Sequence, residues 1–365
     1  MSAESTTSAA RDRAARAGGG VAAIVGPLQG YHHETYVAPL PDEAGYGQGT
    51  EGTEQAEPWR WKFREPRAAL LWFDRRCFLS EEELLVALAG RVRWIPEVKE
   101  KDGFRLQRFI EGRTLGASSP AGTSLPDDVV EQIITLFRQL VAVAPGTLTV
   151  KRRCLERDRV PDGDTAGFLK GLIRFTEERV YLRNEPRFGR LFKEFAIDRN
   201  SFQVLRDRVK GMESRPFTLL HGDLHRENFI VDPDDRLWTI DWELAMVGDP
   251  LYDLATHLHL MRYPQDQADE VAHRWRLAVE DVRAGSAAGC KEDLELLLAY
   301  KRAQSVFTDV IRTAEVLGTT PDRDDDTLHH AAAKLHQVLT AGAPALGLPD
   351  PPECPDIELA LKRWA

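Results

Sequence analysis

The spacing of apolar residues divides the chain into a β-rich part and a helical part. In residues 59–64, aromatic and basic residues alternate, which predicts a half-buried strand. One face of this strand would bury Trp59, Trp61 and Phe63, and the opposite face would carry only basic side chains. Residues 104–110 predict a further strand of the same sheet. The alternation indicates that one face of this strand is buried and the other is exposed to solvent.

Three other features complete this part of the chain. An apolar run over residues 21–25 opens a glycine-containing segment that predicts the first hairpin, ending at residue 37. Residues 42–58 are polar and rich in glycine, which is typical of a disordered loop. Ser80 precedes an apolar run and Glu83 follows three positions later, so we expect a helix that begins with an N-cap and a capping box.

From about residue 113 onward, the apolar residues recur at three- and four-residue spacing, which predicts helices. The pattern is clearest over residues 127–143, where Val130, Ile133, Phe137 and Leu140 share one face. The other predicted helices span residues 165–182, 198–212, 252–262, 265–284, 292–317 and 325–341, and a short helix follows a proline-rich link at the carboxyl end. The patterns therefore predict a part with strands followed by a helical part.

Composition and charge narrow the class of protein. The chain has 365 residues and a net charge of −10, which argues against nucleic acid as a partner because a phosphate backbone requires a basic face. The four cysteines lack metal-ligand spacing and are expected to be reduced thiols in a cytoplasmic protein. No apolar run has membrane-spanning length, so we expect no membrane association. Residues 1–20 lack an apolar core and are interpreted as a mobile tail that could include a short Ala/Arg helix.

The candidate chemistry lies in the stretch LLHGDLHRENFIVDPDDRLWTIDWELAMVGDPLYDLA, which begins at Leu219. Asp223 and Asn228 lie on a loop after a short strand, and Asp241 ends the hairpin that follows. Carboxylate and amide oxygens are the ligands that Mg²⁺ prefers, and this spacing is typical of phosphoryl-transfer loops. The alternative is that all three residues cap turns. The complete set, in this order and on a hairpin, favours phosphoryl transfer.

The segments HGDLHRENFIVD, IDWE and GDPLYDLA resemble the aminoglycoside phosphotransferase and choline kinase-like family, which has the protein-kinase-like fold. The resemblance implies the α+β fold class, with a small β-rich N-lobe of mainly antiparallel sheet over residues 21–112 and a larger, mainly helical C-lobe over residues 113–365. It implies that Asp223 is the catalytic base and that His221 belongs to the same catalytic set. Asn228 and Asp241 would be Mg²⁺ ligands, with ATP as the phosphate donor.

The same stretch contains structural residues and one departure from the family pattern. Asp249 or Asp253 would tie the catalytic loop to the following helix. Arg226 and Glu227 stand where the family typically has Pro-Gly. This departure leaves Asp223 in place, but the substrate does not follow from that of close relatives.

The basic face of the predicted strand at residues 59–64 would hold the ATP phosphates. We expect Lys62 to make this contact, with Arg64 as the alternative. The fold pairs such a lysine with a glutamate of the small-lobe helix. The register of that helix favours Glu81 over Glu82 as the partner.

Two further segments are expected to contact the nucleotide. Gly26 and Gly30 in the first hairpin would let backbone N–H groups approach phosphates, although the segment lacks the G-x-G-x-x-G pattern. The strand that contains Arg108 and Ile110 resembles the hinge of the fold, where backbone groups would meet the adenine.

Two functions remain open from the sequence. The first is an ATP- and Mg²⁺-dependent kinase of a small hydroxylated molecule, such as an aminoglycoside or other antibiotic, a sugar or a similar metabolite. The second is a kinase-like protein that phosphorylates Ser or Thr of a biosynthetic peptide, or that binds a peptide or partner protein without transferring phosphate. The unusual glycine segment and the Arg226-Glu227 pair support a non-catalytic scaffold. The complete set of Asp223, Asn228 and Asp241 favours the enzyme.

Overall fold

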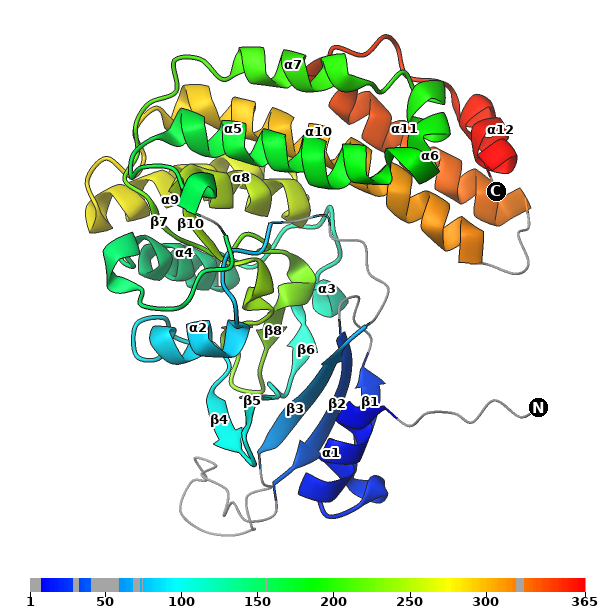
Figure 1. Ribbon diagram of the computed structural model, residues 1–365. Helices are drawn as coiled ribbons and strands as arrows, with labels where there is room; N and C mark the ends of the chain where they lie inside the picture. The colour runs from blue at the N-terminus through cyan, green and yellow to red at the C-terminus, as the bar shows by residue number, and fades with distance from the viewer. Residues whose placement is uncertain are drawn as a thin grey trace, which may run out of the picture. The chain divides into compact units, whose positions relative to one another are not determined.

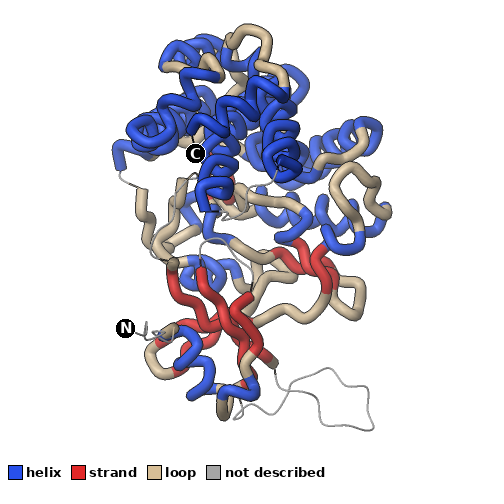
Figure 2. The backbone as a smooth tube through the Cα atoms, turned by 90° about the vertical axis from the view of Figure 1, so that its right-hand side faces the viewer, coloured by secondary structure: helices blue, strands red, loops and turns tan. Residues whose placement is uncertain are grey.

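The computed structural model describes residues 8–28, 33–40, 59–67, 73, 75–154, 156–319 and 325–364. The chain forms two compact units, each assembled from separate segments (Figure 1). Unit 1 comprises Met1–Leu71, Ser80–Pro120 and Glu227–Trp242. Unit 2 comprises Trp72–Leu79, Ala121–Arg226 and Glu243–Ala365. The predicted α+β class is confirmed, because strands dominate unit 1 and helices dominate unit 2 (Figure 2).

The main sheet of unit 1 has five antiparallel strands in the order β1-β2-β3-β5-β4. The strands are β1 (Val25–Leu28), β2 (His33–Pro39), β3 (Arg60–Pro66), β4 (Val98–Lys101) and β5 (Phe104–Arg108). The apolar run that predicts the first strand is displaced: Val21–Ala23 forms a 3-10 turn, and the strand begins at Val25. Val21 is 61% exposed, so this side chain covers no face of the sheet. The predicted loop over residues 42–58 lies outside the described residues.

The alternation along β3 is confirmed. Trp61 and Phe63 are buried in a cluster that also contains Ala10 and Ala14 of helix α1 (Ala9–Ala17). Both alanines are fully buried, so α1, which lies within the stretch interpreted as a tail, packs on the sheet. The core of this face therefore combines strand residues with a helix from the start of the chain.

Helix α2 (Glu81–Leu88) begins as predicted. The Ser80 Oγ accepts a hydrogen bond from the Glu83 N–H at 3.1 Å, and Leu84 and Leu88 are buried. The second half of the predicted capping box is wrong. The Glu83 carboxylate accepts a hydrogen bond from the Arg105 guanidinium at 2.8 Å, because that charged donor on β5 is a stronger partner than a backbone N–H.

A second sheet in unit 1 carries the predicted hairpin after the catalytic loop. Its order is β6-β8-β9, formed by β6 (Arg113–Thr114), β8 (Phe229–Val231) and β9 (Leu237–Thr239), and the short helix α3 (Leu115–Ser118) follows β6. Asp232 organises the turn of the hairpin. Its Oδ1 accepts the N–H groups of Asp234 and Arg236 at 2.9 Å, and its Oδ2 accepts the Trp238 Nε1–H at 2.8 Å. A single aspartate thus closes the turn that precedes Asp241.

Unit 2 is mainly helical, and its two short strands β7 (Thr218–Leu220) and β10 (Met246–Gly248) pair antiparallel. Its longer helices are α4 (Asp127–Val141), α5 (Thr165–Phe175), α6 (Arg183–Glu194), α7 (Arg199–Arg208), α8 (Pro250–Met261), α9 (Gln265–Val282), α10 (Cys290–Thr319), α11 (Asp325–Leu346) and α12 (Cys354–Trp364). No described helix is long and apolar enough to cross a membrane.

Helix α6 is the one long helix that the sequence pattern did not predict, because Pro186 interrupts the sequence. A π-helical segment, η4 (Thr176–Leu182), joins α5 directly to α6. Because the helical run continues from η4 into α6, Pro186 lies inside it, and its missing N–H removes a backbone hydrogen bond. Phe188 and Leu191 on the next turns are fully buried, so apolar packing stabilises the helix.

Candidate active site

The loop after β7 is held in place by a buried carboxylate of helix α8. The Oδ2 of Asp253 accepts the His221 N–H at 2.9 Å, and its Oδ1 accepts the Gly222 N–H at 2.8 Å. Gly222 has a φ of 81°, and a Cβ at this position would lie 2.8 Å from the Leu244 carbonyl oxygen. The loop therefore requires glycine at 222 and an acceptor at 253, and the predicted structural role of Asp253 is confirmed.

Asp223 lies on this loop with its side chain 27% exposed. Its N–H donates to the Nδ1 of the buried His221 at 3.3 Å, and its Oδ2 lies 3.4 Å from the His225 Nε2. Burial by itself would raise the pKa of Asp223, but the hydrogen bond and charge of His225 outweigh it and hold this pKa below its ordinary value. A carboxylate that stays ionised at neutral pH can accept a proton or orient a hydroxyl group.

His257 contacts the backbone of the loop after β7, and the sequence pattern did not predict this contact. Its Nδ1 lies 3.0 Å from the Leu224 carbonyl oxygen, and its Nε2 lies 2.9 Å from the Tyr263 hydroxyl. Burial lowers the pKa of His257 to about 3, so the ring is neutral. A neutral ring satisfies both contacts when Nδ1–H donates to the carbonyl and the Tyr263 hydroxyl donates to Nε2. No group of three His, Cys, Asp or Glu residues arranged for a metal occurs among the described residues.

Arg226, which replaces the typical proline of the resembling family, is buried and structural. Its Nε donates to the Met261 carbonyl at 3.0 Å, and its Nη2 donates to the Thr123 carbonyl at 2.8 Å. The side chain is only 4% exposed. The arginine therefore ties the loop after β7 to the end of α8, so the departure from the family pattern has a local structural reason.

The start of α8 rests on a buried ion pair. Asp249 caps the helix through the Leu251 N–H at 3.0 Å and accepts two hydrogen bonds from Arg215, each at 2.8 Å. Arg215 also donates to Asp293 on α10 at 2.6 Å. Because both charges are fully buried, their pairing and hydrogen bonding offset the cost of desolvation. Of the two aspartates predicted to tie the loop to the helix, Asp253 contacts the loop, whereas Asp249 caps the helix and binds Arg215.

In unit 1, the β8–β9 hairpin brings the two predicted metal ligands to the same end. Phe229 pairs with Thr239, and the Ile240 N–H donates to the Asn228 carbonyl at 3.0 Å. Asp241 follows directly with a φ of 63°, a left-handed conformation that aspartate tolerates better than most residues. One carboxylate and one amide at this position are suitable ligands for Mg²⁺.

Glu81 links helix α2 to the residue after Asp241. Its carboxylate binds the Arg64 Nη1 at 2.7 Å and accepts the Trp242 N–H at 3.0 Å. The predicted partner was Lys62, but the structure pairs Glu81 with Arg64, which also pairs with Glu82. Burial alone would raise the pKa of Glu81, yet the charge of Arg64 lowers it to about 2. The guanidinium has enough donors to bind both glutamates.

Lys62 lies on the same face of β3, two residues from Arg64. Burial lowers its pKa first, and the charge of Arg64 lowers it further. The carboxylates of Glu81 and Asp241 oppose both effects. No acidic side chain in the described part of the chain lies within ion-pair distance of the Lys62 ammonium group. A half-buried cation in this setting is suited to a phosphate oxygen.

Of the two glycines predicted to approach phosphates, the structure describes Gly26 but not Gly30. Gly26 has a φ of 138°, and a Cβ there would lie 2.8 Å from the Thr35 carbonyl oxygen. The close approach of β1 to β2 is a structural reason for glycine at this position. Gly30 lies outside the described residues. A phosphate contact at either glycine remains a prediction.

The predicted hinge is an apolar segment flanked by a stacked arginine. The Arg108 guanidinium lies 3.9 Å from the Trp59 ring centroid and 3.0 Å from the Glu97 carboxylate. The Arg108 backbone N–H donates to the Glu97 backbone carbonyl. Ile110 packs in a buried cluster with Ile230 and Trp238. Ile240, which precedes Asp241, is partly buried against this cluster. The predicted adenine contacts of Arg108 and Ile110 remain predictions, and the apolar cluster is compatible with them.

A family profile and a curated protein match parts of this chain. The profile described as "Phosphotransferase enzyme family" matches residues 50–287. Protein LicA of Haemophilus influenzae is 43% identical over 49 residues, which cover 13% of this chain and 18% of that protein, so the match spans less than a fifth of this curated relative.

Two solved structures share the fold at low sequence identity. Macrolide 2'-phosphotransferase MphH from Brachybacterium faecium aligns with a TM-score of 0.50 and 16% identity, over 89% of this chain and 97% of that one. A putative aminoglycoside phosphotransferase from Ralstonia eutropha aligns with a TM-score of 0.54 and 13% identity, over 88% and 91% of the two chains. The predicted protein-kinase-like fold is therefore confirmed.

Proposed function

The chain belongs to the phosphotransferase enzyme family, and we propose that it transfers the γ-phosphate of ATP, with Mg²⁺, to a hydroxyl group of a small molecule. One observation carries this proposal: the hydrogen bond from the Ile240 N–H to the Asn228 carbonyl brings the amide of Asn228 and the carboxylate of Asp241 to the same end of one hairpin. Turn caps alone would not require this pair of hard oxygen ligands in this order.

The ligands that unit 1 offers fit Mg²⁺ bound together with a nucleotide. Mg²⁺ keeps several waters and takes only one or two protein ligands when it binds phosphates. Asn228 and Asp241 would hold the ion, which would neutralise negative charge on the phosphates when bound. Lys62 would hold a phosphate oxygen. The Arg64–Glu81 pair would keep β3 in register with the Asp241 backbone, because Glu81 also binds the Trp242 N–H.

Unit 2 would supply the acceptor side of the reaction. The ionised carboxylate of Asp223 would accept a hydrogen bond from the acceptor hydroxyl and take its proton. His221 would act as a positioning residue, because its ring accepts the Asp223 N–H and is fully buried. Asp253 and His257 would hold the loop so that Asp223 keeps one orientation. Asp253 and His257 act through hydrogen bonds to backbone groups of the loop.

The names of similar proteins support a hydroxylated small molecule as the acceptor. The fold is shared with a macrolide 2'-phosphotransferase, and a short segment is similar to LicA. Neither name fixes the acceptor of this chain, since the structural likeness is at 16% identity and the LicA match covers 49 residues. The proposal therefore specifies the reaction class and leaves the acceptor to the properties of unit 2.

The test combines nucleotide binding with a screen for turnover. ATP with Mg²⁺ should raise the melting temperature of the wild-type protein, because a ligand of the native state stabilises it by mass action. A panel of hydroxylated compounds should include at least one that triggers ATP consumption by the wild type, at a rate that falls strongly in Asp223→Asn. An absence of Mg²⁺-dependent stabilisation by ATP would contradict the proposal.

A further inference from the structure

Unit 2 contains a cavity of about 460 Å³ whose wall is dominated by arginine. We propose that the acceptor is an anionic, phosphate-bearing hydroxylated small molecule whose phosphate group binds in this cavity. The proposal rests on the proposed function and narrows its substrate class. The cavity is lined by Arg75, Arg76, Arg153, Cys154, Asp158, Gly171, Arg174, Phe175, Glu178, Arg179 and Arg183. Six of these residues are basic and two are acidic. We name this site the arginine cavity.

One wall of the arginine cavity is a single helical surface. Gly171 and Arg174 lie on α5, Arg179 lies on the π-helical segment η4, and Arg183 begins α6. A π-helical turn contains more residues than an α-helical one, and such turns are frequent at functional sites. The segment keeps Arg179 and Arg183 at the same cavity. Gly171 has open space where a side chain would lie, so the wall has room for a ligand.

The positive charge of the cavity is only partly compensated. Arg76 pairs with Glu243 at 2.7 Å, and Arg174 pairs with Asp158 at 3.2 Å.

The other arginines keep their charge without a carboxylate partner in the described structure. Arg75 donates to the backbone carbonyl of Asp158 at 2.6 Å, which leaves its charge uncompensated. Among the residues that the structure describes, no carboxylate lies within ion-pair distance of Arg153, Arg179 or Arg183. Guanidinium groups bind phosphate through two parallel hydrogen bonds, so a cavity with this charge favours an anion and disfavours a polycation.

The size and charge of the cavity indicate a phosphate ester more than a carboxylate or a peptide. A phosphate monoester carries a charge of about −1.5 to −2 at neutral pH, roughly twice that of a carboxylate. The wall holds six arginines against Asp158, Glu178 and the Cys154 thiolate, and the net positive charge that remains matches the higher charge of a phosphate ester. The volume of about 460 Å³ lies within the range of small-molecule pockets, roughly 300 to 1,000 Å³. The net charge of −10 for the whole chain does not decide this preference, because local charges dominate at short range.

Two lining residues of the arginine cavity also line a small cavity beside Gly222, within the same unit. A second cavity of about 10 Å³, enough for about one water molecule, shares Arg75 and Phe175 with the first. This second cavity is also lined by Gly222, the residue before Asp223, and by Tyr252 and other residues of unit 2. The arginine cavity therefore neighbours the loop that carries Asp223, and the proposal places the hydroxyl group of the acceptor at Asp223.

Transfer of the phosphoryl group requires only ATP and the acceptor as reactants. The acceptor oxygen forms a bond to the γ-phosphorus of ATP, and the bond between that phosphorus and the bridging oxygen of the β-phosphate breaks. ADP leaves with the electron pair of that bond. The hydroxyl proton passes to the Asp223 carboxylate and then to solvent.

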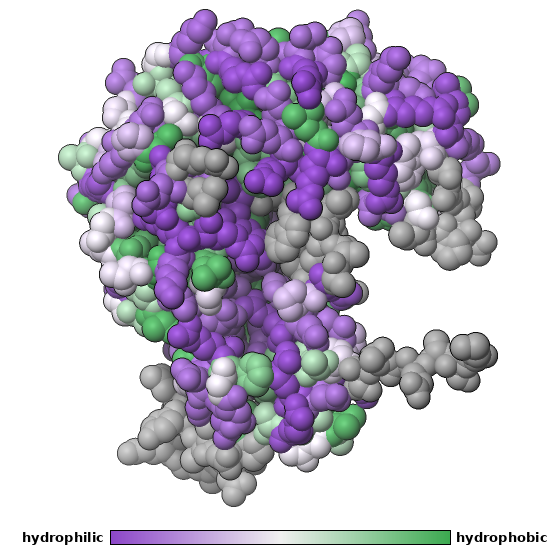
Figure 3. Space-filling model, in the orientation of Figure 1, coloured by the Kyte–Doolittle hydropathy of each residue, from purple (hydrophilic) through white to green (hydrophobic). Residues whose placement is uncertain are grey.

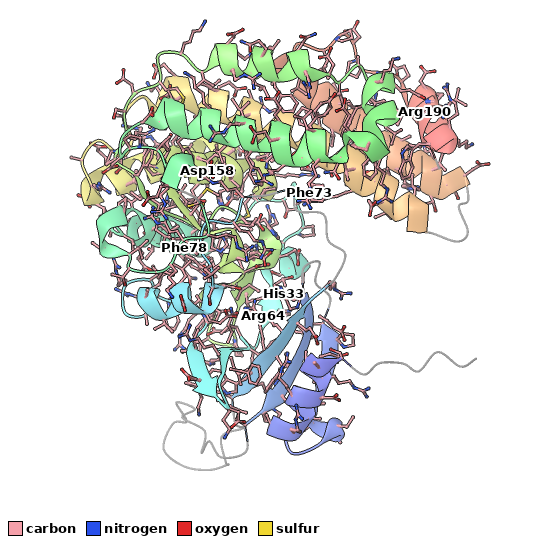
Figure 4. The ribbon with its side chains drawn as sticks, viewed as in Figure 1. His33, Arg64, Phe73, Phe78, Asp158 and Arg190 are labelled. Atoms are coloured by element: carbon pink, nitrogen blue, oxygen red, sulfur yellow. The ribbon has the colours of Figure 1, made fainter. Side chains whose placement is uncertain are left out.

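A pair of matched double variants tests the site. Arg179→Gln/Arg183→Gln removes two exposed charges from the cavity wall. The control, Arg187→Gln/Arg190→Gln, removes two exposed charges further along α6, where the side chains are 57% and 60% exposed. Figure 4 labels Asp158 at the cavity and Arg190 at the control position. Both variants change the net charge equally, so non-specific attraction of anions changes equally in both.

Binding is measured with inorganic phosphate at constant ionic strength by calorimetry and thermal shift, with acetate as the carboxylate probe. We expect phosphate to bind the wild type and the control with similar affinity, and to bind the cavity variant at least about 10-fold more weakly. Stronger binding of acetate than of phosphate would overturn the choice of a phosphate ester. Equal phosphate affinity in the two double variants, or none in any protein, would overturn the site.

Alkylation of Cys154 gives an independent readout of position. This cysteine lines the arginine cavity, and a hydrogen bond from Cys77, with a further one from Arg159, lowers its pKa to about 5. Its thiolate should react readily with iodoacetamide in a Cys354→Ser background. We expect phosphate to slow the reaction in the wild type and in Arg187→Gln/Arg190→Gln, but not in the cavity variant. Equal slowing in all three proteins would contradict binding in the cavity.

Measurements of turnover distinguish a failure of the phosphate-site proposal from a failure of the proposed function. A panel of sugar phosphates, the corresponding free sugars and aminoglycosides is tested for ATP consumption. We expect sugar phosphates to be preferred, and the cavity variant to raise their KM with little change in kcat. Turnover of cationic acceptors that is indifferent to the cavity variant would overturn this inference alone. Phosphate binding that depends on the cavity, without ATP consumption by any acceptor, would overturn the proposed function alone.

Discussion

The Oδ2 of Asp253 lies 2.9 Å from the backbone nitrogen of His221, so a helix and the catalytic loop are joined by one buried carboxylate. Burial raises the pKa of Asp253 to about 6 from an ordinary value of 3.8, although the two backbone N–H groups that it accepts oppose the shift. The same carboxylate that holds the loop is therefore partly protonated in mildly acidic solution.

This shift predicts a pH-dependent contribution to stability. A raised carboxyl pKa means that the folded state binds the proton more tightly than the unfolded state. The stabilisation is fully present below pH about 4 and is lost as the pH rises through about 6. The free energy of unfolding of the wild type, relative to Asp253→Asn, should fall by on the order of 3 kcal/mol between pH 4 and pH 7. Urea unfolding curves across this range measure the difference, and parallel pH profiles would contradict it.

The Asp223 carboxylate is expected to act on the acceptor and not on the nucleotide. Asp223→Asn should therefore lower kcat by about 100-fold or more while leaving the affinity for ATP nearly unchanged. Asp234→Asn is the matched control, because Asp234 lies on the β8–β9 turn and its side chain is 64% exposed. Steady-state ATP consumption and nucleotide titrations measure both quantities. Wild-type turnover in Asp223→Asn would show that the loop is not catalytic.

Asp241 and Asn228 are expected to contribute unequally to Mg²⁺ binding. Asp241→Asn removes the charge but preserves a side chain that tolerates a φ of 63°, so the fold should be retained. It should abolish the Mg²⁺-dependent part of the thermal shift caused by ATP. Asn228→Ala should reduce that part less, because a neutral amide contributes less than a carboxylate. A larger effect of Asn228→Ala than of Asp241→Asn would reverse the assignment.

Substitution of Lys62 should impair ATP binding, whereas substitution of Arg64 should impair stability. Lys62→Met should weaken ATP binding with little loss of stability. Arg64→Met should destabilise unit 1 by on the order of 3 kcal/mol, because it leaves the buried carboxylate of Glu81 without its cation. Adding Glu81→Leu to Arg64→Met should recover part of that loss. Denaturation curves and ATP titrations of Lys62→Met, Arg64→Met and Arg64→Met/Glu81→Leu distinguish a phosphate contact from a structural ion pair. A Lys62→Met protein that is destabilised but binds ATP normally would show that Lys62 has the structural role.

The sequence by itself determined the elements whose signals are local. Alternation of aromatic and basic residues placed β3, and the turn residues from Asp232 to Asp235 placed the hairpin before Asp241. The order of Asp223, Asn228 and Asp241 indicated the chemistry, because residue types and short spacings define such a loop. The one long helix that was missed, α6, contains Pro186, and burial of Phe188 and Leu191 outweighs that local signal.

Only the tertiary structure decided which side chains meet. Lys62 and Arg64 share one strand face and one charge, so the sequence could not show that α2 presents Glu81 and Glu82 to Arg64. The arginine cavity was also invisible, because its arginines come from distant segments of the chain. Hydrophobic periodicity reports the face of an element that is buried. The partner of a polar side chain depends on how elements pack, which is a long-range property.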